Sequence, residues 1–236
     1  MKREIIGVTE PIRVSSKRAA DPKKLVTELA ETGRAFHARG WALGTSGNYS
    51  AVLREKPLRL LITSSGVDKA YMNKKHFLEI DDHANILRGD GRPSAESLLH
   101  VAVARARGAK SVLHTHSVWG TILSDRHAGK HKSMAISGYE MLKGFEGVKT
   151  HEHQEWIPIF ENSQDIPFLA KEVEALLKQD PRPHGFLLRG HGLYTWGESV
   201  AQAHRHVEIF EFLLEVVGRR ELAEHGGKGG GWLLGN

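Results

Sequence analysis

The chain has 236 residues, a net charge of +5 and no cysteine, so any bound metal must be held by histidine and carboxylate side chains rather than by thiolates. No block of Lys and Arg with interleaved aromatic residues occurs, which argues against nucleic-acid binding, and no apolar run approaches the ~20 residues of a bilayer-spanning helix. We therefore expect a cytoplasmic protein with neither a nucleic-acid nor a membrane partner.

The first predicted elements are a helix, two strands and a hairpin. Asp21 is a suitable N-cap and Pro22 a suitable first helical residue, so a helix is expected to begin there. Strands follow over residues 49–53 and 58–63, where apolar and β-prone residues cluster. A hairpin is expected over residues 77–87.

The second half of the chain alternates irregularly between helical and strand patterns. Ser94 is expected to cap a helix that ends near Arg107. Later strands and helices are expected over residues 111–116, 119–123, 134–136, 156–160, 165–178, 185–188, 193–196 and 198–217. This order predicts a single-domain α/β fold, layered, with a mixed sheet and helices on its faces. We expect the domain to span residues 21–220, between an N-terminal extension (1–20) and a flexible glycine-rich tail (221–236).

Two histidines, His114 and His116, stand two positions apart at the end of an apolar segment that is typical of a buried strand. Residues i and i+2 of a strand point to the same face, so both imidazoles can reach one metal ion. Catalytic metal sites usually have three protein ligands and an open position. His191, flanked by two glycines at the end of another predicted strand, is the candidate for the third ligand.

Other histidine pairs are interpreted differently. His151 and His153 lie in a polar stretch with no apolar run leading into it, which indicates a solvated loop or strand edge. His204 and Glu208 are one turn apart on the C-terminal helix, and we interpret them as part of its solvated face.

Two turns of small residues are candidates for an anion site. Residues 44–50 and 64–66 are rich in glycine and hydroxyl side chains, and free backbone N–H groups in such turns form anion-binding concavities. Neither turn matches the P-loop or the dinucleotide fingerprint. Lys69 follows the second turn closely, and the modest positive charge of the chain suits a phosphorylated substrate. A phosphate cradle is thus predicted, with ordinary turns as the open alternative.

Two glutamates, Glu96 and Glu140, are candidates for a functional carboxylate. Glu96 falls in the first turn of a predicted helix, where the helix dipole favours a negative charge without any catalytic role. Glu140 lies in a short segment bounded by glycines, residues 138–144, and local sequence alone favours an ordinary exposed glutamate there.

Five short motifs occur in one order, at residues 44–48 (GTSGN), 64–66 (SSG), 93–96 (PSAE), 114–116 (HTH) and 190–193 (GHGL). In this order they make the chain resemble the class II aldolase/adducin family over roughly residues 21–217. Within the family, three longer stretches resemble the branch that dehydrates a methylthio-substituted ketose phosphate, at residues 65–69, 140–144 and 189–197.

The resemblance implies a single-domain layered αβα fold around a central mixed, largely antiparallel sheet, and it also implies site residues and a cofactor. It implies one zinc ion per subunit held by His114, His116 and His191. It implies a phosphate cradle formed by Gly47, Asn48, Ser65, Gly66 and Ser94. The dehydratases carry their acid/base at the position of Glu140, whereas the sugar-phosphate aldolases use the glutamate that matches Glu96. Because this chain has both, the division of labour between them stays open.

The implied reaction is zinc-dependent dehydration of 5-methylthio-D-ribulose 1-phosphate to 2,3-diketo-5-methylthiopentyl 1-phosphate, a step of methionine salvage. The implied partner is this small phosphorylated ketose. The resemblance also implies a homotetramer with the site near a subunit interface, where a neighbouring chain can contribute a residue. The open alternatives are a class II sugar-phosphate aldolase, a pentose-phosphate 4-epimerase and a non-catalytic interaction module like the adducin head.

Overall fold

The computed structural model describes residues 21–129 and 132–226. The predicted N-terminal extension and residues 227–236 of the predicted tail lie outside these residues. None of the helices in the described part of the chain combines the length and the apolar content needed to cross a bilayer.

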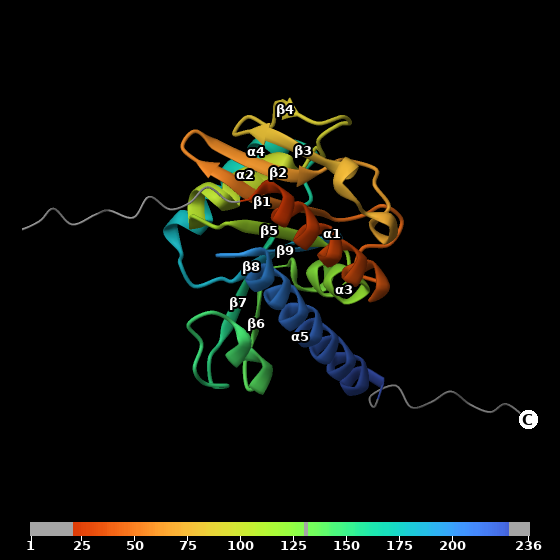
Figure 1. The fold of residues 1–236 in the computed structure, drawn as a ribbon. Helices are drawn as coiled ribbons and strands as arrows, with labels where there is room; N and C mark the ends of the chain where they lie inside the picture. The colour runs from red at the N-terminus through yellow and green to blue at the C-terminus, as the bar shows by residue number, and fades with distance from the viewer. Residues whose placement is uncertain (1–20, 130–131, 227–236) are drawn as a thin grey trace, which may run out of the picture.

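A nine-stranded sheet forms the centre of the molecule, in the order β4-β3-β2-β1-β5-β9-β8-β7-β6 (Figure 1). Its strands are β1 (Asn48–Glu55), β2 (Leu58–Thr63), β3 (Phe77–Asp81), β4 (Ile86–Arg88), β5 (Ser111–Thr115), β6 (Ser133–Ile136), β7 (Glu155–Phe160), β8 (Gly185–Leu188) and β9 (Gly192–Gly197). Neighbouring strands are antiparallel except β7 and β8, which are parallel. The prediction of a mixed, largely antiparallel sheet is confirmed.

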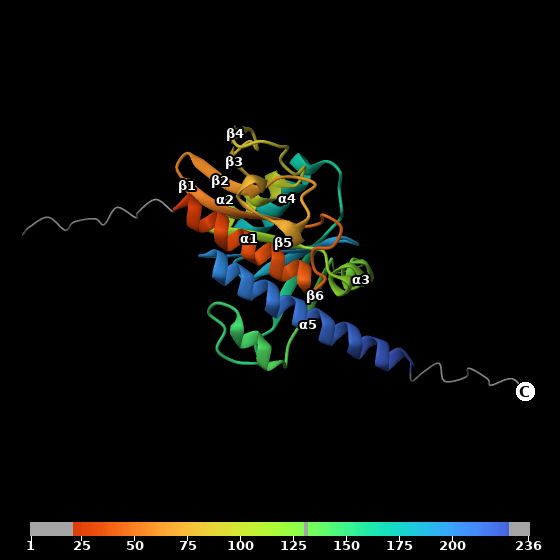
Figure 2. The same cartoon turned by 45° about the vertical axis from the view of Figure 1, so that its right-hand side comes forward.

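Helices cover both faces of the sheet. They are α1 (Pro22–Ala38), α2 (Ser97–Arg107), α3 (Val118–His127), α4 (Ile166–Gln179) and α5 (Val200–Gly226), with the short 3-10 helices η1 (Lys69–Tyr71), η2 (Lys74–His76) and η3 (Glu140–Gly144). Helices α1 and α5 lie side by side on one face (Figures 1 and 2), while α2 and α4 pack together on the other. This is the layered αβα arrangement that the sequence predicted.

Strand β5 is buried along its whole length, between the two helical layers. Val112 packs with residues of α2 and α4, whereas Leu113 packs with residues of α1 and α5. Since side chains alternate along a strand, His114 follows Val112 to the α2 face and Thr115 follows Leu113 to the α5 face. The same alternation that places Val112 and Leu113 in the core therefore also sets the direction of the histidine side chains at the end of β5.

Two predicted boundaries differ from the structure. Helix α2 begins at Ser97, so Ser94 is not its N-cap. A β-bridge between Ser64 and Pro93 places Ser94 just before a tight turn, where its carbonyl accepts hydrogen bonds from the backbone N–H and hydroxyl of Ser97. Helix α5 extends to Gly226, with an i,i+4 Arg220–Glu224 ion pair in its last turns, so residues 221–226 of the predicted tail are helical.

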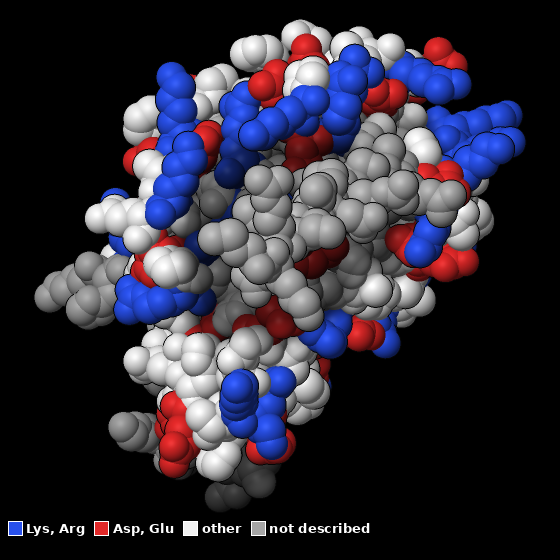
Figure 3. All heavy atoms as spheres, turned by 60° about the vertical axis from the view of Figure 1, so that its left-hand side comes forward, with Lys and Arg blue, Asp and Glu red and all other residues white. Residues whose placement is uncertain are grey.

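Charges of both signs mix on the surface. On the face shown in Figure 3, Lys and Arg side chains lie among Asp and Glu side chains of the described residues.

Candidate metal centre

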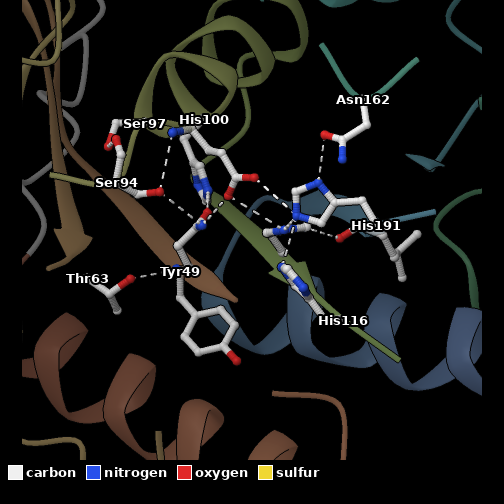
Figure 4. A network of polar contacts seen from close by, with 12 residues as sticks. Tyr49, Thr63, Ser94, Ser97, His100, His116, Asn162 and His191 are labelled. Carbon is white, nitrogen blue, oxygen red and sulfur yellow. Dashed lines mark hydrogen bonds and ion pairs between the residues drawn. The ribbon is translucent and has the colours of Figure 1, made fainter. Parts of the chain in front are cut away.

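Strand β5 and the turn between β8 and β9 bring three histidines together, as the sequence predicted (Figure 4). The Nε2 atom of His191 lies 3.1 Å from Nε2 of His116 and 3.3 Å from Nε2 of His114. One ligand atom from each ring falls within 4.8 Å of the other two. This separation suits three ligands of a single ion.

Hydrogen bonds on the far side of two rings fix which nitrogen faces the centre. His114 donates from Nδ1 to the carbonyl oxygen of Leu193 at 2.9 Å, and His191 donates from Nδ1 to Oδ1 of Asn162 at 3.1 Å. In a neutral imidazole the other nitrogen then carries a lone pair. Metal-binding histidines are typically oriented by such a bond to a carbonyl or carboxylate oxygen.

A close approach between β5 and β9 shapes the floor of the site. A Cβ atom on Gly192 would lie 2.0 Å from the carbonyl oxygen of Thr115 and 3.1 Å from the ring of His114. Glycine is therefore required for the two strands to meet here. The ring of Tyr194 stacks on His114 with centroids 4.0 Å apart, which holds the imidazole in one plane.

The charge state of His114 and His116 favours metal binding. Burial lowers the pKa of His114 well below its ordinary value, and the neighbouring rings add to this shift. Burial, together with His191 and Lys69, lowers the pKa of His116 to about 4. Neutral rings with converging lone pairs repel unless a cation lies between them. The donor set therefore fits a borderline divalent ion such as zinc.

Glu96 is the carboxylate that lies at the three histidines. Its Oε1 is 3.2 Å from Nε2 of His191, and its Oε2 is 3.7 Å from Nε2 of His114. The side-chain amide of Asn48 donates to Oε2 at 2.7 Å. Glu96 ends the loop before α2 and is mostly buried, so its charge is directed at the centre.

A buried histidine, His100, completes this network (Figure 4). His100 accepts at Nδ1 from the hydroxyl of Ser50 at 2.8 Å and donates from Nε2 to Oδ1 of Asn48. Burial lowers the pKa of His100 to about 3, so the ring is neutral. Sequence reasoning missed His100, although it lies one helical turn after Glu96 and could have been found by that spacing.

Beside the histidines lies a small pocket of about 140 Å³. Its lining includes every residue predicted for the phosphate cradle, namely Gly47, Asn48, Ser65, Gly66 and Ser94, and it also includes Glu96 and His116. Gly47 has a φ of +77°, and a Cβ there would lie 2.8 Å from the carbonyl oxygen of His114. The predicted turns therefore form one concave surface that opens beside the candidate metal ligands.

Lys69 contacts Thr45, one of the residues that line the pocket. Its side chain is 1% exposed, and Nζ donates to the carbonyl oxygens of Thr45 at 3.0 Å and Val67 at 2.8 Å. One ammonium group thus joins the two turns of the predicted cradle. Burial lowers the pKa of Lys69 to about 8.

Glu140 lies apart from this centre within one chain. It begins η3, has a 72% exposed side chain, and pairs with Lys143 and with His151 at 3.8 Å. The hydrogen bond from Lys143 lowers the pKa of Glu140. Among the described residues, no contact joins Glu140 to the three histidines.

Proteins of similar sequence cover most of the chain. It is 43% identical over 188 residues to a methylthioribulose-1-phosphate dehydratase of Marinobacter nauticus, a match that covers 79% of this chain and 89% of that protein. It is 44% identical over 194 residues to a protein of the same name from Pseudomonas aeruginosa, with 82% and 93% covered.

Solved structures with the same fold include a putative aldolase/epimerase/decarboxylase and an L-fuculose-1-phosphate aldolase. YgbL of Escherichia coli superposes with a TM-score of 0.69 at 25% identity, covering 83% of this chain and 88% of that one. L-fuculose-1-phosphate aldolase of Thermus thermophilus superposes with a TM-score of 0.66 at 23% identity, covering 89% and 99%.

The model of the class II aldolase and adducin N-terminal domain matches residues 27–217, a range that contains β1 to β9 and all the residues of the candidate centre. The chain belongs to the class II aldolase and adducin N-terminal domain family.

Proposed function

We propose that this chain is a hydro-lyase that dehydrates 5-methylthioribulose 1-phosphate to the corresponding 2,3-diketone in methionine salvage. The observation that carries the proposal is the 43–44% identity to named methylthioribulose-1-phosphate dehydratases, over about nine-tenths of their length. The three convergent histidines and the adjacent pocket support it, because a ketose phosphate needs a site for its carbonyl and a site for its phosphate. The cytoplasmic location stays a prediction.

The proposed ion is zinc, held by His114, His116 and His191. When bound, zinc would supply Lewis acidity that polarises the ketone and makes the neighbouring C–H group more acidic. The chain orients this centre through Leu193, Asn162 and the stacked ring of Tyr194.

The proposed phosphate site is the pocket formed by the turns around Gly47 and Ser65 and by Ser94. Backbone N–H groups and hydroxyls there would hold the phosphate and so place C2 to C4 of the sugar beside the histidines. Binding energy from the phosphate then contributes to orientation at the reacting carbons.

The reaction needs one group that removes a proton and returns one. The base takes the proton from C3, the C4 hydroxyl leaves as water with a returned proton, and a C3=C4 double bond forms. The resulting enol converts to the 2,3-diketone, so the net change is the loss of one water. A carboxylic acid can perform both transfers when its pKa lies near the working pH.

We assign this role to Glu140 of a neighbouring subunit, and we propose a homotetramer with the site near an interface. Within one chain Glu140 is too exposed for a raised pKa, but it stands on a protruding segment beside the 38% exposed Met141. Coverage by a second subunit would bury the carboxylate. Glu96 would instead orient the centre and the bound sugar from within the chain.

A second candidate is a sugar-phosphate aldolase, which the position of Glu96 at the three histidines favours. In that reaction Glu96 would handle the proton and no contribution from Glu140 would be needed.

The deciding experiment is turnover of 5-methylthioribulose 1-phosphate by the purified protein, followed as diketone absorbance, with metal content measured on the same sample. We expect turnover that depends on bound zinc and disappears in a His114→Ala protein. A metal-loaded protein that releases dihydroxyacetone phosphate or glycolaldehyde phosphate from a sugar phosphate, and no diketone, would replace the dehydratase by the aldolase.

A further inference from the structure

A second group of potential metal ligands lies away from the centre described above, at the opposite end of β8. His184 precedes β8, whereas His191 follows it. With His153 and Glu155, His184 forms a group whose ligand atoms all lie within 4.8 Å of one another. The sequence indicated a solvated position for His153, but its ring is half-buried because it turns inward onto Glu155.

The ligand atoms converge on one carboxylate oxygen. Oε2 of Glu155 lies 2.9 Å from Nε2 of His153 and 2.8 Å from Nδ1 of His184. The carboxylate of Glu155 is 0% exposed. Among the described residues, no Lys or Arg side chain forms an ion pair with it. A positive charge stabilises a buried carboxylate, and a ring proton or a metal ion can supply that charge here.

The outer contacts of the group are those of oriented metal ligands. His184 donates from Nε2 to the carbonyl oxygen of Glu146 at 2.9 Å, so Nδ1 of the neutral ring presents its lone pair to the group. Oε1 of Glu155 accepts from the backbone N–H of His184 at 2.9 Å, which leaves Oε2 for the shared position. His114 and His191 are oriented by the same kind of bond at the first centre.

The group also has access to solvent and an open side. The side chains of His153 and His184 are 28% and 18% exposed, while Glu155 forms the floor. Two imidazoles and one carboxylate leave at least one coordination position for water, as zinc prefers four ligands.

From this geometry we propose that His153, Glu155 and His184 form a second site for a divalent transition metal such as zinc. The site goes beyond the proposed reaction and does not depend on it. Bound metal would link the connection between β6 and β7 to the start of β8, because His153 lies in that connection and His184 directly precedes β8. The same connection contains Glu146 and η3, so the ion would restrict the movement of this protruding segment.

The rival occupant is a proton. Although burial favours a neutral ring, the hydrogen bond and charge of Glu155 raise the pKa of His184, and an imidazolium would satisfy the same contacts. The metal-bound site and the site with a protonated His184 differ in metal content, so a measurement of bound metal distinguishes them.

The test counts metal per chain after saturation of the purified full-length protein with Zn²⁺ and removal of excess ion. The variants are His153→Ala, which removes one ligand, and His151→Ala as the matched control. His151 lies in the same turn, is 56% exposed and contacts Glu140 rather than this group. A third protein, His114→Ala/His116→Ala, removes the first centre and isolates the second.

We expect two zinc ions in the wild type and in His151→Ala, and one in His153→Ala and in the double variant. One zinc in the wild type, unchanged by His153→Ala and lost in the double variant, would overturn the proposal in favour of the protonated pair. If His153→Ala does not fold, Co²⁺ added to the double variant gives the decision: ligand-field absorption bands support the site, and their absence at one equivalent refutes it.

Discussion

His100 donates a hydrogen bond to the same Asn48 side chain whose amide group holds Glu96 at the candidate metal centre. A buried, neutral ring thereby sets the orientation of the carboxamide, because the donation from His100 requires Oδ1 of Asn48 to face it. The amide nitrogen must then face Glu96. Two hydrogen bonds of the Asn48 side chain thus connect the buried ring of His100, on α2, with Glu96 beside the candidate metal ligands.

This arrangement predicts a specific acid sensitivity. His100 has a pKa of about 3 in the folded chain, below the unfolded value, so the unfolded state binds more protons as the pH falls. The contribution of His100 to the free energy of unfolding is therefore unchanged above the unfolded pKa of about 6.5. Below that pH the free energy of unfolding falls progressively, by about 2 kcal/mol at about pH 5.

A His100→Gln variant, whose amide can still donate to Asn48, should remove this dependence. Its free energy of unfolding, measured by urea titration of the metal-free protein, should fall less between neutral pH and about pH 5 than that of the wild type, by about 2 kcal/mol. An identical fall in both proteins would show that His100 is not the titrating group.

Asn162 is expected to act through His191. In Asn162→Ala the ring loses the acceptor for its Nδ1–H group, and metal affinity should fall by about 10- to 100-fold. Asn162→Asp keeps an acceptor oxygen and should retain tight binding. Competition with a chromophoric chelator measures both, and equal affinity of Asn162→Ala and wild type would exclude this orienting role.

Lys69 is expected to support phosphate binding. Loss of its two charge-assisted hydrogen bonds in Lys69→Met should raise the KM for the sugar phosphate by about 10- to 100-fold, with a smaller change in kcat. The exposed Lys75→Met is the control. Because the ammonium loses its proton above a pKa of about 8, the KM of the wild type should rise above that pH, whereas the KM of Lys69→Met should not.

The assignment of Glu140 to a neighbouring subunit predicts complementation. Glu140→Gln and His114→Ala proteins should each be inactive, yet subunits mixed by reversible unfolding should regain about a quarter of wild-type turnover if tetramers assemble at random. A mixture that stays inactive would place both groups in one chain. A Glu140→Gln protein that keeps zinc and full turnover would remove Glu140 from the mechanism.

Local periodicity in the sequence was sufficient to predict an α/β domain with a mixed sheet and the shared face of His114 and His116. Two residues at spacing i and i+2 at a strand end must share a face, so His114 and His116 required no tertiary information. The glycines around His191 likewise indicated a close backbone approach, which Gly192 makes against Thr115. The small-residue turns were predicted for the same reason, since their free N–H groups follow from local composition.

Other features depend on contacts that no local pattern encodes. His100 matters because α2 packs over β1 and places it beside Asn48. His153 was assigned to solvent because its neighbours in sequence are polar. Its partner His184 lies 31 residues later, just before β8, and both rings contact the carboxylate of Glu155. The position of Glu140 relative to the centre depends on the arrangement of subunits.

The histidines of the first centre come from places 75 residues apart in the chain, His116 after β5 and His191 before β9. An ion bound there fastens the two ends of a long loop and binds only the folded chain. At a free ion concentration 1,000 times the dissociation constant, such binding adds about 4 kcal/mol to stability. Cells short of the metal would then hold less of this protein, because the unloaded chain unfolds more often and is degraded. Supply of the ion would thus set abundance as well as activity.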